Sequence, residues 1–164
     1  MELKQLYAEI INEHNLNPSH RGQIKNPSME LRGVNPSCGD NIFLQIEFED
    51  DKVKDAVFNG SGCAISQASV DMMCDLIIGQ KKSEALHLSK IFNSMIQGTA
   101  SEEEIESLDE ASLLKDIAHM PARVKCAVLG WKTMEEMLLS DKKTSCASES
   151  CDGKNCPLRK NSGE

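Results

Sequence analysis

Residues 42–58 read IFLQIEFEDDKVKDAVF and predict a β-hairpin. Apolar side chains alternate along 42–48, which is the two-residue period of a strand with one buried face. The acidic triplet at 49–51 forms the turn, and 53–58 forms the returning strand. Residues 29–34 can add a third strand. Because two or three strands alone are marginally stable in water, the sheet needs a cover.

The rest of the ordered chain is predicted to supply that cover as helices. Apolar residues recur at helical spacing in 2–14 and 64–78. Further helices are predicted over 83–96 and over 109–118, the latter capped by Asp109, and a last helix begins at Pro121. In that last helix the apolar stripe is Ala127, Trp131, Met134 and Leu138. Strands followed by helices indicate an α+β domain, with a small three-stranded antiparallel sheet covered by helices.

The C-terminal segment differs in composition from the remainder. Residues 141–164 are rich in Lys, Ser, Asp, Asn and Gly, with almost nothing to bury. We therefore predict one domain over 1–140 and a flexible tail over 141–164 that carries Cys146, Cys151 and Cys156.

Charge and hydropathy exclude several classes of partner. The net charge is −8 and the chain has no block of Lys or Arg, so nucleic acid and anionic membrane surfaces are poor partners. No apolar run approaches the roughly 18 residues of a membrane span, and the N-terminus lacks the pattern of a signal peptide. We expect a cytoplasmic protein. In that reducing compartment the seven cysteines favour metal binding or sulfur chemistry over disulfides.

Three cysteines lie at the predicted ends of elements, where separate segments of the chain can meet. Cys38 lies in a turn before a strand, Cys63 at the start of a helix, and Cys126 early in the last helix. Asp40, two residues after Cys38, can face the same ion. Three thiolates and a carboxylate suit Zn²⁺. Spacing alone leaves open that these are ordinary buried cysteines, as we predict for Cys74 on an apolar helix face.

Longer motifs surround these residues. They read NPSCGD at 35–40, GSGCAISQAS at 60–69 and PARVKCA at 121–127, and HNLNP at 14–18 precedes them. Together they resemble the ligand motifs of the IscU/SufU family of iron–sulfur cluster assembly proteins, also known as the NifU-like N-terminal family. The resemblance covers roughly residues 1–140 and implies the SufE/IscU-like fold.

Within that family the chain resembles the SufU branch. The IscU branch has a His immediately before the last Cys, where this chain has Lys125. An acidic insertion around 98–109 is also typical of SufU.

The resemblance implies a function and a site. SufU-like proteins accept persulfide sulfur from a PLP-dependent cysteine desulfurase of the SufS kind, and other iron–sulfur assembly proteins are possible partners. Zinc would be held by Cys38, Asp40, Cys63 and Cys126. Cys38 would be released as the sulfur acceptor when the desulfurase offers a His to the zinc, and Arg123 would support the site. The protein would then act as a sulfurtransferase-like partner of the desulfurase.

Two alternatives remain at this point. The same four ligands can hold a [2Fe–2S] cluster, in which case the protein is an assembly scaffold. A closed structural zinc site is the third interpretation.

Overall fold

The computed structural model describes residues 3–36 and 39–150 of the chain. Its elements, in chain order, are α1 (Leu3–Leu16), β1 (Met29–Asn35), β2 (Asp40–Glu49), β3 (Lys52–Ser61), α2 (Ala64–Ile77), α3 (Lys82–Gln97), α4 (Glu102–Glu106), the 3₁₀ helix η1 (Asp109–His119) and α5 (Pro121–Ser150).

The predicted sheet is confirmed. Its three strands are antiparallel in the order β1-β2-β3, and Leu44 pairs with Leu31 on one side and Phe58 on the other. The β2–β3 hairpin turns at Asp50, whose φ is 58°, and a register shift follows Glu47. Alternate side chains of β2 are buried, as the sequence pattern predicts. The chain thus has the expected α+β class.

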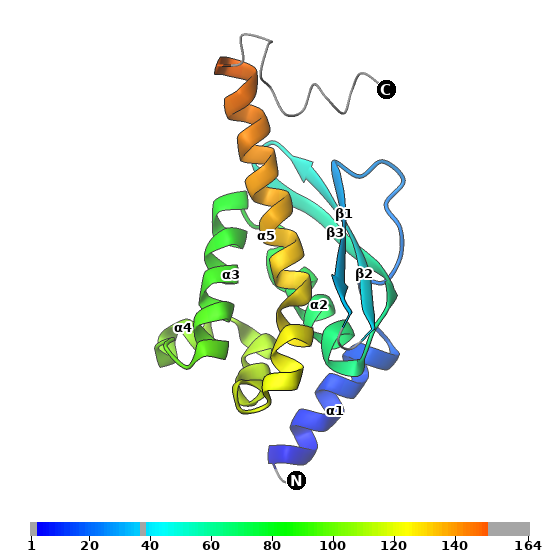
Figure 1. Ribbon diagram of the computed structural model, residues 1–164, viewed down its shortest axis with the longest axis vertical. Helices are drawn as coiled ribbons and strands as arrows, with labels where there is room; N and C mark the ends of the chain where they lie inside the picture. Colours follow the sequence, from blue (N-terminus) through cyan, green and yellow to red (C-terminus); the bar gives the residue numbers. More distant parts are fainter. Residues whose placement is uncertain (1–2, 37–38, 151–164) are drawn as a thin grey trace.

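Helices cover one face of this sheet. α2 and α5 pack against the strands and against each other, and α3 packs on α5 and η1 (Figure 1). The stripe predicted for the last helix is buried, with Ala127, Trp131 and Met134 at 0 % exposure and Leu138 at 1 %. The predicted burial of Cys74 is also confirmed. In this arrangement the C-terminal ends of β1 and β3 and the N-terminal end of β2 lie close to the starts of α2 and α5.

One predicted helix differs from the structure, and the last helix runs past residue 140. Residues 109–118 form a 3₁₀ helix that begins after Leu108, and Asp109 has a φ of 48° instead of capping an α-helix. α5 continues to Ser150, ten residues beyond the predicted boundary at 140, because no Gly or Pro interrupts 131–150. Residues 151–164, with Cys151 and Cys156, lie outside the described part of the chain, and the division into domain and tail stays a prediction.

A buried tryptophan joins the three helices of the core. The Trp131 ring on α5 stacks on Phe92 of α3, with centroids 4.5 Å apart. Its Nε1 donates to Ser69 Oγ of α2 at 3.1 Å, and Ser69 Oγ donates to the carbonyl of Ala127 at 2.5 Å. This chain of contacts ties the segment next to Cys126 to α2.

An acid–histidine network fastens α1 to the domain. His14 Nδ1 is 2.6 Å from Asp71 of α2, and its Nε2 contacts Glu110 of η1. The backbone N–H of His20 donates to the same Asp71, and the His20 ring contacts Asp75. Sequence spacing gave no sign of this network, since its members come from four separate segments.

The network predicts a pH dependence of stability. Burial lowers the pKa of His14, but hydrogen bonds and charge interactions with Asp71 and Glu110 outweigh it and raise the pKa. The folded state therefore binds the proton more tightly than the unfolded chain. The resulting stabilisation is complete below about pH 6.5 and is lost as pH rises through the raised value.

We expect His14→Gln to lower the free energy of unfolding by about 1.5–3 kcal/mol at pH 6, and by less at pH 9. Urea unfolding of both proteins across this pH range measures the difference. A difference that stays constant with pH would show that the charged form of His14 is not what holds α1.

Among the helices of the described part of the chain, none has the length and apolar character needed to cross a membrane.

Candidate metal centre

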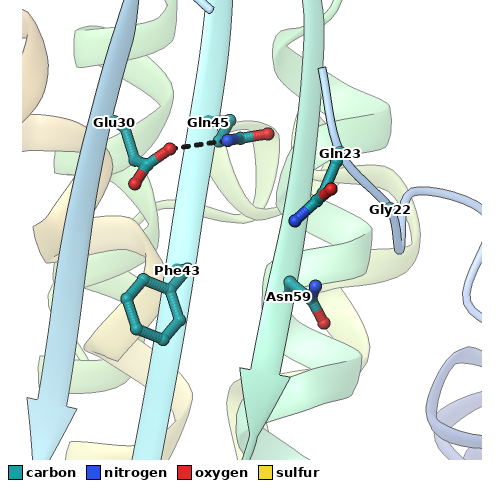
Figure 2. A pocket seen from close by; sticks show the side chains of 6 residues that line it. All are labelled: Gly22, Gln23, Glu30, Phe43, Gln45 and Asn59. Carbon is teal, nitrogen blue, oxygen red and sulfur yellow. Dashed lines mark hydrogen bonds between the residues drawn. The ribbon is translucent and has the colours of Figure 1, made fainter. Parts of the chain in front are cut away.

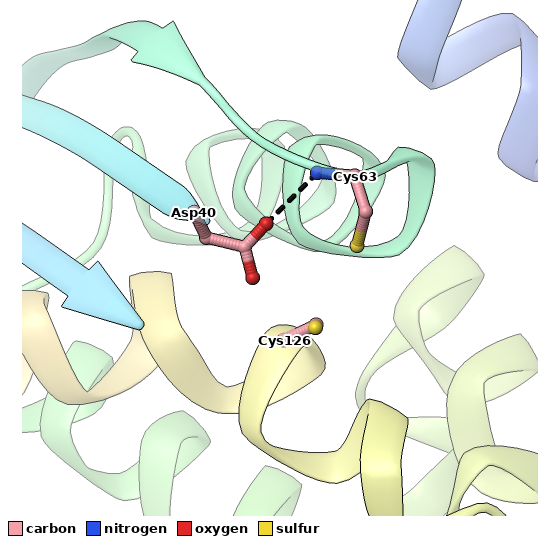
Figure 3. A group of neighbouring side chains, drawn as sticks. All are labelled: Asp40, Cys63 and Cys126. Carbon is pink, nitrogen blue, oxygen red and sulfur yellow. Dashed lines mark hydrogen bonds between the residues drawn. The ribbon is translucent and has the colours of Figure 1, made fainter. Parts of the chain in front are cut away.

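Three elements bring their ends together at one point. Asp40 is the first residue of β2, Cys63 is the N-cap of α2, and Cys126 lies in the second turn of α5. One ligand atom from each lies within 4.8 Å of the others. Figure 3 shows the carboxylate and both sulfurs pointing toward one another from separate elements.

Asp40 is a buried carboxylate with a full set of partners. It is 1 % exposed. Its Oδ1 accepts hydrogen bonds from the backbone N–H of Cys63 at 2.8 Å and from Ser66 Oγ at 3.1 Å, and its Oδ2 accepts one from Asn35 Nδ2 at 3.3 Å. Burial raises the pKa of Asp40, but hydrogen bonds from Cys63, Cys126, Ser66 and Asn35 outweigh it and lower the pKa. Asp40 is therefore ionised at neutral pH, as a metal ligand must be.

Two glycines allow the backbone before Cys63 to pass close to β2 and Asp40. A Cβ on Gly60, whose φ is 108°, would lie 2.1 Å from the carbonyl oxygen of Asn41 across the β2–β3 ladder. A Cβ on Gly62 would lie 2.4 Å from Ser66 Oγ and 2.9 Å from Asp40 Oδ1. The motif GSGC thus places Cys63 against Asp40 because both positions lack a side chain.

Arg123 adds positive charge beside the sulfurs. It lies in the first turn of α5, exposed to solvent. Its interaction with Cys63, and its hydrogen bond and charge interaction with Cys126, raise the pKa of the guanidinium. The supporting role of Arg123 stays a prediction.

The predicted ligands are thus partly placed by the structure. It brings Asp40, Cys63 and Cys126 together, while Cys38 lies outside the described residues. Sequence reasoning gave no role to Asn35 and Ser66. Both are buried against Asp40, and both lie inside the quoted motifs NPSCGD and GSGCAISQAS, which is the signal that would have found them.

The donor set fits a soft cation. With metal–ligand bonds of about 2.0–2.3 Å, donors that already lie this close need only small side-chain rotations to share one Zn²⁺. Thiolates also bind iron in iron–sulfur clusters. A carboxylate with two sulfurs is a poor site for Mg²⁺ or Ca²⁺, which take oxygen ligands.

A separate pocket lies on the outer face of the sheet, where Figure 2 shows six lining residues. Gln45 Nε2 donates to Glu30 Oε2 at 2.6 Å across β1 and β2, and the backbone N–H of Ile24 donates to Gln45 Oε1. The described residues that line this pocket include no cysteine or histidine, so they offer no soft metal donor.

The chain matches a known protein family. A model described as the NifU-like N-terminal domain matches residues 6–138. The chain belongs to this family. Because the match includes Asp40, Cys63, Cys126 and the position of Cys38, the whole candidate centre lies inside the family domain.

Relatives of this NifU-like domain carry two kinds of name. The iron–sulfur cluster assembly scaffold protein IscU of Streptococcus pyogenes serotype M1 is 41 % identical over 138 residues, covering 84 % of this chain and 85 % of the relative. The zinc-dependent sulfurtransferase SufU of Bacillus subtilis is 41 % identical over 134 residues, covering 82 % and 90 %. A protein named as an IscU scaffold in Thermotoga maritima is 40 % identical, covering 84 % and 96 %.

Solved structures share the fold of this NifU-like domain. A crystal structure titled as a hypothetical protein aligns with a TM-score of 0.78 at 40 % identity, covering 84 % of this chain and 99 % of the other. A putative iron–sulfur cluster assembly scaffold protein for the SUF system from Fervidobacterium islandicum aligns with a TM-score of 0.76 at 38 % identity, with the same coverage.

Proposed function

We propose that this protein is a SufU-type sulfur acceptor for iron–sulfur cluster assembly. In this proposal it holds Zn²⁺ on Cys38, Asp40, Cys63 and Cys126, and takes persulfide sulfur from a PLP-dependent cysteine desulfurase in the cytoplasm. The observation that carries it is the meeting of Asp40, Cys63 and Cys126 within 4.8 Å, at the ends of three distant segments. The similarity to the zinc-dependent sulfurtransferase SufU of B. subtilis supports it.

Two local features support the SufU branch over the IscU branch. Lys125 is exposed and stands where the IscU branch has a His, so this side chain adds no ligand next to Cys126. The acidic insertion around 98–109, which is typical of the SufU branch, contains the short helix α4 with a capping box between Ser101 and Glu104.

The proposed chemistry is a thiol–persulfide exchange. When bound, Zn²⁺ keeps its cysteine ligands deprotonated, and the thiolate is the form that attacks sulfur. The Cys38 thiolate attacks the outer sulfur of the partner's persulfide, so a new S–S bond forms on Cys38. The partner's S–S bond breaks and its cysteine leaves as a thiolate, with no oxidant consumed. Arg123 offsets the negative charge of the sulfurs while the partner docks.

The second candidate is a scaffold for a [2Fe–2S] cluster on the same ligands. The relatives named IscU in S. pyogenes and T. maritima favour it, at identities equal to that of the SufU relative. Cysteine and carboxylate ligands suit either occupant, so the donor set does not separate the two functions.

Metal analysis and desulfurase kinetics separate them. We expect the purified protein to contain about one zinc and to stimulate alanine production by a cysteine desulfurase supplied with cysteine. A brown protein with visible charge-transfer absorption and no stimulation would support the scaffold instead. Zinc without either effect would indicate a structural site.

The role of Cys38 has its own test. We expect Cys38→Ala to retain zinc with reduced affinity and to lose at least 90 % of sulfur acceptance, since about a tenfold effect or more follows when the attacking thiolate is removed. Sulfur bound per protein after incubation with desulfurase and cysteine measures this. Cys74→Ala is the matched control, because that buried thiol packs in the core and should leave acceptance unchanged. Full acceptance by the Cys38 variant would refute the assignment.

A further inference from the structure

Beside its interaction with the Cys126 sulfur, Asp40 accepts hydrogen bonds from three groups that are not sulfurs: the Cys63 backbone N–H, the Ser66 hydroxyl and the Asn35 amide. Its Oδ1 is occupied by the backbone N–H of Cys63 and the hydroxyl of Ser66. Its Oδ2 is the oxygen left facing the sulfurs, and Figure 3 shows it directed toward Cys126. A carboxylate fixed in this way can offer one oxygen to an ion but cannot chelate with both.

Ser66 fixes the first oxygen. It lies in the first turn of α2, is 1 % exposed, and its Oγ also lies 3.0 Å from the carbonyl oxygen of Cys63. A hydroxyl has one proton to donate, and an ionised carboxylate is a stronger acceptor than a carbonyl. The proton of Ser66 therefore favours Asp40, and Cys63 offers a second acceptor if Asp40 moves.

Asn35 bridges two of the candidate ligands. It ends β1, pairs with Asp40 across the β1–β2 ladder, and is 6 % exposed. Its Nδ2 lies 3.3 Å from Asp40 Oδ2 and 3.6 Å from Cys126 Sγ. The two amide protons can serve one acceptor each, so Asn35 reduces the repulsion between a carboxylate and a thiolate that are both buried.

We propose that Ser66 and Asn35 are positioning residues that hold Asp40 as a single-oxygen ligand and thereby set the affinity and exchange rate of the centre for zinc. This inference rests on the proposed metal site. The hydrogen bonds fix the orientation of the Asp40 carboxylate before an ion binds, so a variant without them must order this ligand on binding and loses affinity. Partners of this kind typically change metal affinity by about 10–100-fold.

The test compares two buried serines. Ser66→Ala removes the donor to Asp40, whereas Ser89→Ala removes a buried hydroxyl of α3 that donates to Glu135. We expect Ser66→Ala to weaken zinc binding by about tenfold in competition with a chelator, and to speed zinc release to a similar extent. Ser89→Ala should leave the zinc affinity and the rate of zinc release within about twofold of the wild type. Each variant should lower the melting temperature of the metal-free protein, because each loses a buried hydrogen bond.

A spectroscopic measurement tests the single-oxygen geometry. With Co²⁺ in place of zinc, the wild type should show the strong visible bands of a four-coordinate ion. In Ser66→Ala, Oδ1 keeps only the hydrogen bond from the backbone N–H of Cys63, so it can also approach the ion as a fifth contact and the intensity should fall. Ser66→Thr, which keeps the hydroxyl, should restore the affinity and the spectrum.

The outcomes distinguish the two proposals. A wild type that binds no zinc would overturn the proposed function. A wild type that binds zinc, with Ser66→Ala unchanged in affinity, release and Co²⁺ spectrum, would overturn the positioning role alone. If Ser66→Ala does not fold, Asn35→Ala takes its place with the same expected tenfold loss, and unchanged binding there would equally contradict the proposal.

Discussion

Replacing Cys126 with alanine should reduce zinc affinity by about two orders of magnitude. Structural zinc sites with four ligands bind with about 10–16 kcal/mol, so one ligand in four accounts for roughly 3 kcal/mol, or about a hundredfold in affinity. Cys126 is fully buried beside Asp40 and Cys63, which leaves little room for water to replace its sulfur. Chelator competition followed by metal analysis measures the change.

Cys74→Ala is the matched control for this prediction as well. Cys74 is equally buried, but the pKa of its thiol is raised well above the usual value by burial and by nearby carboxylates, which disfavours the thiolate that a metal needs. The control should keep its zinc. If Cys126→Ala binds zinc as tightly as the wild type, then Cys126 is not a ligand and the proposed centre is wrong.

The largest loss of stability is expected from Trp131→Ala. The indole is fully buried, stacks on Phe92 and donates to Ser69, so the variant loses packing and leaves a cavity at the junction of α2, α3 and α5. Such substitutions cost about 3–5 kcal/mol in the free energy of unfolding. Urea unfolding of the metal-free protein measures it without a contribution from bound zinc.

Trp131→Phe separates packing from hydrogen bonding. It keeps a ring next to Phe92 but removes the N–H that Ser69 accepts, so its cost should lie well below that of Trp131→Ala. A loss under about 1 kcal/mol for the alanine variant would mean that α5 is held mainly by other contacts.

The sheet and most helices could be predicted because the sequence patterns that specify them lie within short, continuous stretches of the chain. Alternation along 42–48 fixes which face of β2 is buried, and the acidic turn fixes the hairpin. The C-terminal end of α5 could not be predicted from burial, since 141–150 offers no apolar stripe, and the helix continues there because nothing in the sequence interrupts it. The cap predicted at Asp109 is wrong because Asp, which suits a helix cap, can also adopt a positive φ, as it does here at the start of a 3₁₀ helix.

The site was predictable in part for a different reason. The residues that would bind metal belong to motifs long enough to be recognised, whereas the residues that support them act through contacts between distant segments. Asn35 meets Cys126 across 91 positions of the sequence, and His14 meets Glu110 across 96. No periodicity encodes such pairs, because they depend on how the helices dock on the sheet.

The three described donors of the centre differ in solvent exposure, so the centre can be approached from one side only. Asp40 and Cys126 are closed off by the strands and helices behind them, whereas Cys63 is only partly covered. An approaching oxidant or docking protein therefore reaches Cys63 before it reaches Cys126. Of these three donors, Cys63 should therefore be the first to exchange or oxidise once Cys38 has left the ion, and Asp40 and Cys126 should release last.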